Sequence, residues 1–294
     1  MDYYEAPLVL TGADGRNYLN EERLGENYFV LRLNDYPLNV AASSQGFSGF
    51  SIPEGAGHSG DFEIFGLAGF STAPFRIKLN DVGVAAGDFM NQPIHHNHVF
   101  GLAGLPFVLA ESIFEPAGRL IQVQVNNLST NIQNAVRLVA LGRQVNSDMD
   151  GEVAERRAAF LANRPTRPYW LTFDNATISV TLAALAANTE AFMTMPSGSH
   201  FACDSIMVES TGPFEFALFD GHSGRSLTFG QGGTGFVDSR ILGGTAALPA
   251  KMLGAPLLQP RRSIRILMND LTGAQNVVHM TLHGRRMRLP VGAG

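Results

Sequence analysis

The chain has 294 residues, of which 45% are hydrophobic and 16% charged, and its formal net charge is −5. That length is too great for one comfortable core and suits two domains. The single cysteine, Cys203, excludes an intramolecular disulfide framework. No stretch approaches the ~18 apolar residues of a membrane helix, and the first residues lack signal-peptide features, so we expect neither a membrane span nor a leader.

Short alternating runs of apolar and polar residues follow one another along the chain. Such period-two alternation is typical of half-buried strands. In chain order the predicted strands cover residues 28–34, 75–79, 120–125, 169–174, 214–218 and 264–268. Clusters of Gly, Pro, Asn and Ser separate them. Roughly eight strands in each half of the chain predict an all-β fold of two jelly-roll-like β-sandwiches. The sequence alone does not separate a jelly roll from another sandwich.

One segment breaks this alternation. Residues 148–163 are rich in helix formers, Asp148 or Asp150 can cap the start, and Pro165 and Pro168 follow the end. We predict a short helical connector here. An extended surface linker is the alternative.

The second half of the chain repeats the first. Residues 105–143 align with residues 248–285 across small gaps, and both segments carry an Asn-Asn/Asp-Leu landmark and a Gly-Arg landmark. A nearly constant shift over such landmarks predicts two copies of one fold. The predicted organisation is a first β-sandwich with an N-terminal arm over 1–145, a helical and Pro-containing connector over 146–168, and a second β-sandwich over 169–294.

Charge is sparse and uneven. The charged fraction of 16% is below the roughly 25% of an ordinary soluble domain, which predicts that other subunits cover part of the surface. The alternative explanation is that all-β domains with Gly- and Asn-rich loops carry fewer charged residues than other domains. Residues 1–60 hold eight acidic residues and three arginines, whereas residues 261–294 hold six arginines and one aspartate. These opposite ends can pair between subunits of a homo-oligomer.

We place the expected subunit contacts in these two ends of the chain. The residues are Tyr3, Tyr4, Arg261, Arg262, Arg285 and Arg286. Nucleic acid is a weaker interpretation of the basic end, because no lysine and no aromatic residue for base stacking lies among its arginines.

The best candidates for metal ligands are three neighbouring histidines, His95, His96 and His98. Imidazoles this close can chelate a metal from a loop. However, no acidic residue is near them in sequence, and the second repeat has no histidine at the equivalent Val237–Arg240. We therefore predict a solvated or interface loop with no metal and no cofactor, unless a symmetry axis multiplies the ligands.

Other motifs do not combine into an active site. The glycine-rich segment Phe229–Phe236 lacks the Lys-Ser/Thr of a phosphate loop, and no Gly-x-Ser-x-Gly elbow occurs. Cys203 has no suggested histidine partner and is expected to be a buried small residue. The sequence therefore predicts a protein that is not an enzyme.

Motifs of the first repeat resemble those of β-rich structural proteins of bacteriophage virions. The resemblance rests on Pro74–Asp81, Met90–Pro93, Phe100–Gly101, Leu105–Phe107, Pro116, Ile121–Ser129, Leu141–Gly142 and the connector end Arg167–Asp174. The second repeat departs from it, because Asn91–Pro93 has no counterpart near Gly230. Proteins of this kind assemble in the host cytoplasm, catalyse no reaction and act through repeated contacts.

The resemblance implies a virion structural protein that binds itself and other virion proteins, as an accessory capsid, spike or head–tail component. A double jelly-roll major capsid protein is the closest alternative. A carbohydrate-binding module or adhesin is an alternative of another class, because tyrosines crowd the N-terminal region and could stack on sugars. Tyr28 and Trp170 fall at nearly equivalent positions in the two repeats, which indicates instead that these rings belong to the core.

Overall fold

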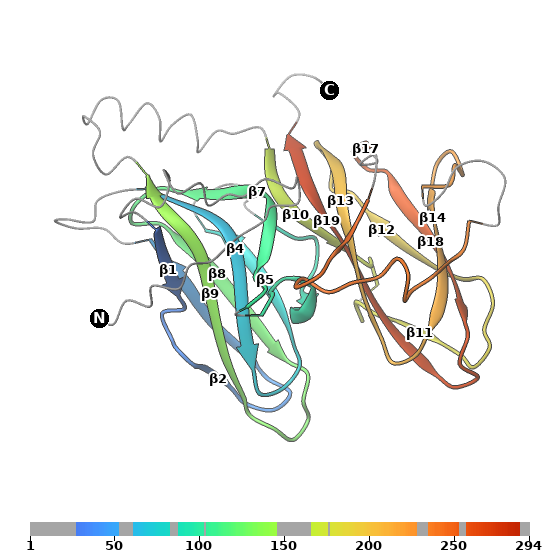
Figure 1. Ribbon diagram of the computed structural model, residues 1–294, viewed down its shortest axis with the longest axis horizontal. Helices are drawn as coiled ribbons and strands as arrows, with labels where there is room; N and C mark the ends of the chain where they lie inside the picture. The colour runs from blue at the N-terminus through green and yellow to red at the C-terminus, as the bar shows by residue number, and fades with distance from the viewer. Residues whose placement is uncertain are drawn as a thin grey trace.

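The computed structural model describes residues 28–52, 61–82, 88–102, 104–145, 166–175, 177–227, 235–252 and 257–288. These residues form two antiparallel β-sandwiches that lie side by side (Figure 1). The predicted all-β fold is confirmed. The predicted helix over 148–163 lies outside the described residues, and Thr166–Pro168, which we assigned to the connector, is part of a strand. In the part of the chain that is described, no helix is long and apolar enough to cross a membrane.

The first sandwich interleaves its strands between two sheets. One sheet runs β1-β9-β4-β7, with β2 also on β9, and consists of β1 (Tyr28–Arg32), β9 (Asn134–Val145), β4 (Asp61–Ser71), β7 (Phe107–Glu115) and β2 (Leu38–Val40). The other runs β3-β8-β5-β6 and consists of β3 (Gln45–Ser51), β8 (Leu120–Asn127), β5 (Phe75–Asp81) and β6 (Ile94–His95). A short 3-10 helix, η2 (His96–His98), follows β6. With β1 and β2 counted as one interrupted strand, this is the order of a jelly roll.

The second sandwich repeats the order of the first. Its β10-β19-β13-β16 sheet consists of β10 (Thr166–Thr172), β19 (Asn276–Arg288), β13 (Ser199–Ser210) and β16 (Ala250–Lys251), joined by β11 (Val180–Leu182) and β17 (Leu257–Leu258). Its β12-β18-β14-β15 sheet consists of β12 (Thr189–Thr194), β18 (Ser263–Asp270), β14 (Phe214–Asp220) and β15 (Val237–Asp238). The strand order therefore resolves the question that the sequence left open: both units are jelly rolls.

The repeated Gly-Arg landmark has a steric cause. A Cβ atom on Gly142 would collide with the carbonyl oxygen of Glu63, and one on Gly284 would collide with the carbonyl oxygen of Ala202. Beside each glycine, the neighbouring strand has a bulge at the same place in both sandwiches. Glycine is needed because the bulged strand comes too close for a side chain.

A repeated asparagine holds the turn between β4 and β5 and the equivalent turn between β13 and β14. Asn134 is 0% exposed, donates to the carbonyl of Ala73 at 2.7 Å and accepts from its N–H at 3.1 Å. Asn276 makes the same pair of bonds with Gly212, at 2.8 and 3.0 Å. The amide satisfies buried backbone groups that the turn would otherwise leave unpaired.

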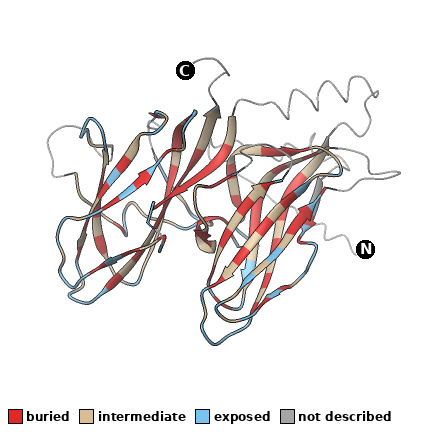
Figure 2. Cartoon of the chain, turned by 180° about the vertical axis from the view of Figure 1, so that it is seen from behind, coloured by how far each residue is buried: buried red, intermediate tan, exposed pale blue. Residues whose placement is uncertain are grey.

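Buried residues recur along the strands of both sandwiches (Figure 2). Trp170 is 0% exposed, but it belongs to the apolar cluster of the first sandwich rather than to that of its own. The sequence placed Trp170 near the position of Tyr28 in the first repeat. The strand pairings give Val30 as the counterpart instead, because Val30 pairs with Leu141 in the same way as Trp170 pairs with His283. The tryptophan therefore fills the junction between the sandwiches.

Candidate functional site: the interface between the two sandwiches

The junction begins as a continuation of the second sandwich's sheet. Phe89–Asn91 of the first sandwich runs beside β10: the N–H of Trp170 donates to the carbonyl of Phe89 at 2.9 Å, and the N–H of Asn91 to that of Trp170 at 3.3 Å. The Asn91 side chain adds two 2.9 Å bonds to the backbone of Thr172. These directional bonds fix one sandwich against the edge of the other.

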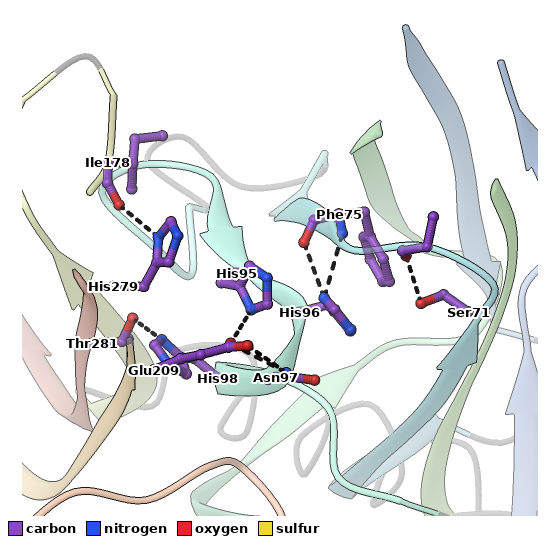
Figure 3. Close-up of polar contacts among 11 residues, drawn as sticks. Ser71, Phe75, His95, His96, Asn97, His98, Ile178, Glu209, His279 and Thr281 are labelled. Atoms are coloured by element: carbon purple, nitrogen blue, oxygen red, sulfur yellow. Dashed lines mark hydrogen bonds and ion pairs between the residues drawn. The ribbon is translucent and has the colours of Figure 1, made fainter. Parts of the chain in front are cut away.

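A cluster of histidines lies beside this backbone contact (Figure 3). This histidine cluster consists of His95, His96 and His98 from the first sandwich, and His279 with Glu209 from the second. His95 Nδ1 lies 2.6 Å from Oε2 of Glu209, an ion pair when the imidazole is protonated. The ring of His95 stacks on that of His279 at 5.1 Å between centroids.

Two further polar contacts join the halves of the cluster. The side-chain amide of Asn97 donates to both oxygens of Glu209 at 3.2 Å. Nδ1 of the fully buried His98 lies 2.9 Å from Oγ1 of Thr281. In addition, the N–H of Ala246 donates to the carbonyl of Asn97 at 2.6 Å. Every residue of η2 except His96 therefore bonds to the second sandwich.

Burial favours the neutral form of His96, His98 and His279. Burial, followed by repulsion from His95, lowers the pKa of His96 to about 4 and that of His279 to about 4. The same two causes lower the pKa of His98 well below its usual value. Burial alone would raise the pKa of Glu209, but hydrogen bonds and charge from His95, and then His98 and Asn97, bring it to about 2.

An apolar contact completes the junction. Phe107 from β7 meets the ring of His283 edge-on at 4.7 Å, and Trp170 lies 4.8 Å from the same ring. His283 is 1% exposed, and burial, with a smaller contribution from Lys251, lowers its pKa to about 3. Aromatic contacts of this kind stabilise an interface beyond their buried area.

A buried acidic pair lies at the far end of the first sandwich. Arg167 of β10 binds Asp81 at 3.0 Å, and the Asp81 side chain is 1% exposed. Nearby, Glu115 is 1% exposed, and burial, followed by repulsion from Asp81, raises its pKa to about 8. One arginine therefore balances one of two buried carboxyl groups, and the second stays protonated at neutral pH.

The histidines take part in the contact between the two sandwiches. His96 Nδ1 turns away from the others and lies 3.2 Å from the carbonyl of Phe75. Among the described residues, no group of three or more His, Cys, Asp or Glu side chains has positions that could hold a metal ion. The sequence did not reveal Glu209 and His279 as partners, because they come from the other repeat.

The structure places four of the six expected contact residues. Arg286 donates to Oγ of Ser199 at 2.8 Å and lies over the ring of Tyr169, and Arg285 lies 3.4 Å from Asp204. Arg262 donates to Gln259 at 3.5 Å, and Arg261 is exposed. Tyr3 and Tyr4 lie outside the described residues. The two C-terminal arginines thus have partners within the chain, and a role of all six residues between subunits stays a prediction.

Cys203 lies in the apolar core of the second sandwich. Cys203 is 1% exposed, as expected of a buried small residue, and its Sγ lies 3.3 Å from Sδ of Met252. Most of the glycine-rich segment Phe229–Phe236 lies outside the described residues. A cavity of about 360 Å³ is lined by residues that include Asp174, Glu190 and Phe192 of the second sandwich.

Comparisons with known proteins give structural likenesses only. No protein-family model matches the sequence, and a search of curated protein sequences found no match. The crystal structure of the STIV major capsid protein is similar at a TM-score of 0.43 and 10% identity, over 89% of this chain and 97% of that one. Peptide:N-glycanase F is similar at a TM-score of 0.37 and 7% identity, over 90% of this chain and 96% of that one. At these values the likenesses do not assign the chain to a family.

Proposed function

We propose that this chain is a structural protein of a virus particle, which catalyses no reaction and acts by cohesion between subunits. The observation that carries the proposal is the pair of jelly rolls joined into one block by a buried junction. Double-sheet jelly rolls build viral capsid domains, although lectin and cupin domains also use them. A block of two similar units presents similar surfaces twice, which suits a repetitive shell.

Exposed apolar side chains support this proposal. Large apolar residues are well exposed on both sandwiches: Phe70 (63%), Leu102 (62%), Ile241 (79%) and Leu248 (69%). Apolar surface of this kind marks contact sites when it is contiguous. It also agrees with the low charged fraction of 16% in the whole chain.

The finer parts of the proposal rest on the sequence resemblance. It supports a bacteriophage as the virus, assembly in the host cytoplasm, and a role as accessory capsid, spike or head–tail component alongside other virion proteins. The jelly-roll order of both units supports the alternative role of a double jelly-roll major capsid protein. Copy number separates these roles, because a shell needs hundreds of copies and a spike or collar needs far fewer.

Electron microscopy and quantitative mass spectrometry of the source particles test the proposal. We expect the chain in purified particles, with density for two jelly rolls in each copy. A purified chain that stays monomeric at every concentration, and that is missing from the particles, would contradict it. Reproducible sugar binding on a glycan array, lost on changing Tyr36 or Phe192 to Ala, would instead favour a carbohydrate-binding module, because both rings are 42% exposed.

A further inference from the structure

The contact between the two sandwiches joins two different surfaces. The second sandwich contributes the outer face of its β10-β19-β13 sheet, here called the docking face, which includes Trp170, Glu209, His279 and Thr281. The first sandwich contributes a docking edge formed by Phe89–Asn91, His95–His98 and Phe107. Contacts between unlike surfaces are head-to-tail and can be repeated from one copy to the next. Since the chain is duplicated, each sandwich also has the counterpart of the surface that the other one uses.

Strand pairing identifies the docking face of the first sandwich. Phe70 pairs with Arg137 as Glu209 pairs with His279, and both strands have the same bulge before this point. Val139 is the counterpart of Thr281, because Val139 pairs with Ala68 as Thr281 pairs with Met207. Val30 is the counterpart of Trp170. The face on β1, β9 and β4 is therefore equivalent, position by position, to the face that is buried in the second sandwich.

This first docking face carries apolar side chains that are exposed to solvent. Val30 is 56% exposed, whereas its counterpart Trp170 is 0% exposed. Phe70 is 63% exposed on the neighbouring part of the sheet. Exposure of large apolar side chains to water is unfavourable in free energy, so burying them in a contact with another molecule would stabilise that contact.

The docking edge of the second sandwich is identified in the same way. Asp238 pairs with Glu215 as His95 pairs with Arg76, at equivalent places on β14 and β5. The loops that follow are equal in length up to Gly101 and Gly244, which accept equivalent bonds from Gly69 and Val208.

Ile241 is therefore the counterpart of His98. It is 79% exposed, whereas the histidine is 0% exposed. Leu248 at the end of the same loop is 69% exposed. The second docking edge is therefore apolar at the position where the first has His98.

The unused face and the unused edge are complementary to each other. Within the chain, the polar pair His98 and Thr281 lies in contact at 2.9 Å. In the docking face of the first sandwich and the docking edge of the second, the equivalent positions are Val139 and Ile241, and both are apolar.

A second pair of positions also differs between the internal junction and these two surfaces. Within the chain, His95 stacks on His279. The same positions in the unused surfaces are Asp238 and Arg137, which carry opposite charges and attract each other across a contact. Asp238 already binds Arg240 at 2.5 Å, so a cation from the partner would complete a charged network.

We infer that the docking face of the first sandwich binds the docking edge of the second sandwich of another copy of this chain. The contact repeats the internal junction, with an apolar pair and an ion pair in place of its histidines. The inference rests on the proposed function in one respect, since it requires the chain to associate with itself. Repeated head-to-tail contacts give a ring if the rotation closes and a filament if it does not.

Pairwise cysteine crosslinking tests the contact. In a Cys203→Ala background, one preparation carries Val139→Cys and another carries Ile241→Cys. Mixing them under mild oxidation should give a reducible dimer, whereas neither preparation alone should form one, because the contact is head-to-tail. The double variant His98→Cys and Thr281→Cys is the matched control, which should crosslink within one chain.

A surface variant gives a second measurement. Phe70→Lys should lower the yield of crosslinked dimer about tenfold or more, because it places a charge in an apolar contact. Phe47→Lys is the control, since Phe47 is 56% exposed on the other sheet of the same sandwich and should leave the yield unchanged.

The outcomes separate this inference from the proposed function. Dimers from either cysteine variant alone would show a self-complementary contact and overturn the head-to-tail arrangement. If the chain forms oligomers and the internal control crosslinks, but the mixture does not, this contact is wrong while a structural role stands. If the chain is monomeric at all concentrations and the mixture gives no dimer, both proposals are wrong.

Discussion

Acidification should weaken the chain through the histidines at the junction. His96, His279 and His283 have folded-state pKa values of about 4, 4 and 3. Their unfolded-state pKa is about 6.5, so the unfolded chain binds protons first as the pH falls. The stability that neutral histidines contribute is complete above pH 6.5 and is lost as the pH falls toward 4. Glu209, with a pKa lowered to about 2, adds a loss in the same direction below about pH 4.5.

The size of the effect follows from these pKa values. A histidine that titrates at 6.5 unfolded and at 4 folded loses about 2 kcal/mol between pH 7 and pH 5. Three such histidines account for about 6 kcal/mol, which is comparable to the whole stability of many domains, about 5–15 kcal/mol. The loss should therefore be large enough to see as a clear shift of the unfolding midpoint.

Trp170 is a suitable reporter for this experiment. It is the only tryptophan, it is 0% exposed, and its ring lies 4.8 Å from that of His283. Urea unfolding followed by tryptophan fluorescence at pH 7, 6 and 5 gives the free energy of unfolding at each pH. His279→Asn should reduce the loss between pH 7 and pH 5 by about 2 kcal/mol, whereas His222→Asn, at an exposed position, should leave it unchanged.

Two results would refute this reasoning. The first is a free energy of unfolding that is equal at pH 7 and pH 5. The second is an equal change of the pH dependence in His279→Asn and His222→Asn, because burial at the junction would then not be its cause.

Three further changes test the packing of the block by urea unfolding at pH 7. Gly142→Ala should cost about 1–3 kcal/mol, because its Cβ collides with the neighbouring strand. Gly104→Ala should cost little, because no atom lies within 4 Å of its added Cβ. Equal costs would exclude the steric explanation. Asn91→Ala should cost about 1–3 kcal/mol, since it leaves backbone groups of β10 unpaired, and an unchanged midpoint would show that water replaces the amide. Arg167→Met should cost about 3–5 kcal/mol, because it removes the ion pair with the buried Asp81. Adding Asp81→Asn should recover most of this loss, and a double variant as unstable as the single one would contradict this account.

The sequence by itself determined the scaffold. Period-two alternation depends only on which face of a strand is buried, so the strands around Ile77, Val123, Phe216 and Ile266 could be predicted locally. The duplication was visible because its landmark residues are required by close backbone contacts. At Gly142, for example, a side chain would collide with the neighbouring strand. The misplaced counterpart of Trp170 has a related cause: a shift of two residues along a strand keeps every side chain on its face, so alternation cannot detect it.

Only the tertiary structure decided the strand order and the junction. The jelly-roll order depends on where long connections lead, and no local pattern encodes that. Glu209 accepts a hydrogen bond from the side-chain amide of Asn97, which is 112 residues away in the sequence. No local sequence pattern predicts a contact between positions so far apart. The histidines alone suggested a metal or a loop, because the partners that bury them come from the other repeat. Their role follows from desolvation between two surfaces, which exists only once both sandwiches are folded and in contact.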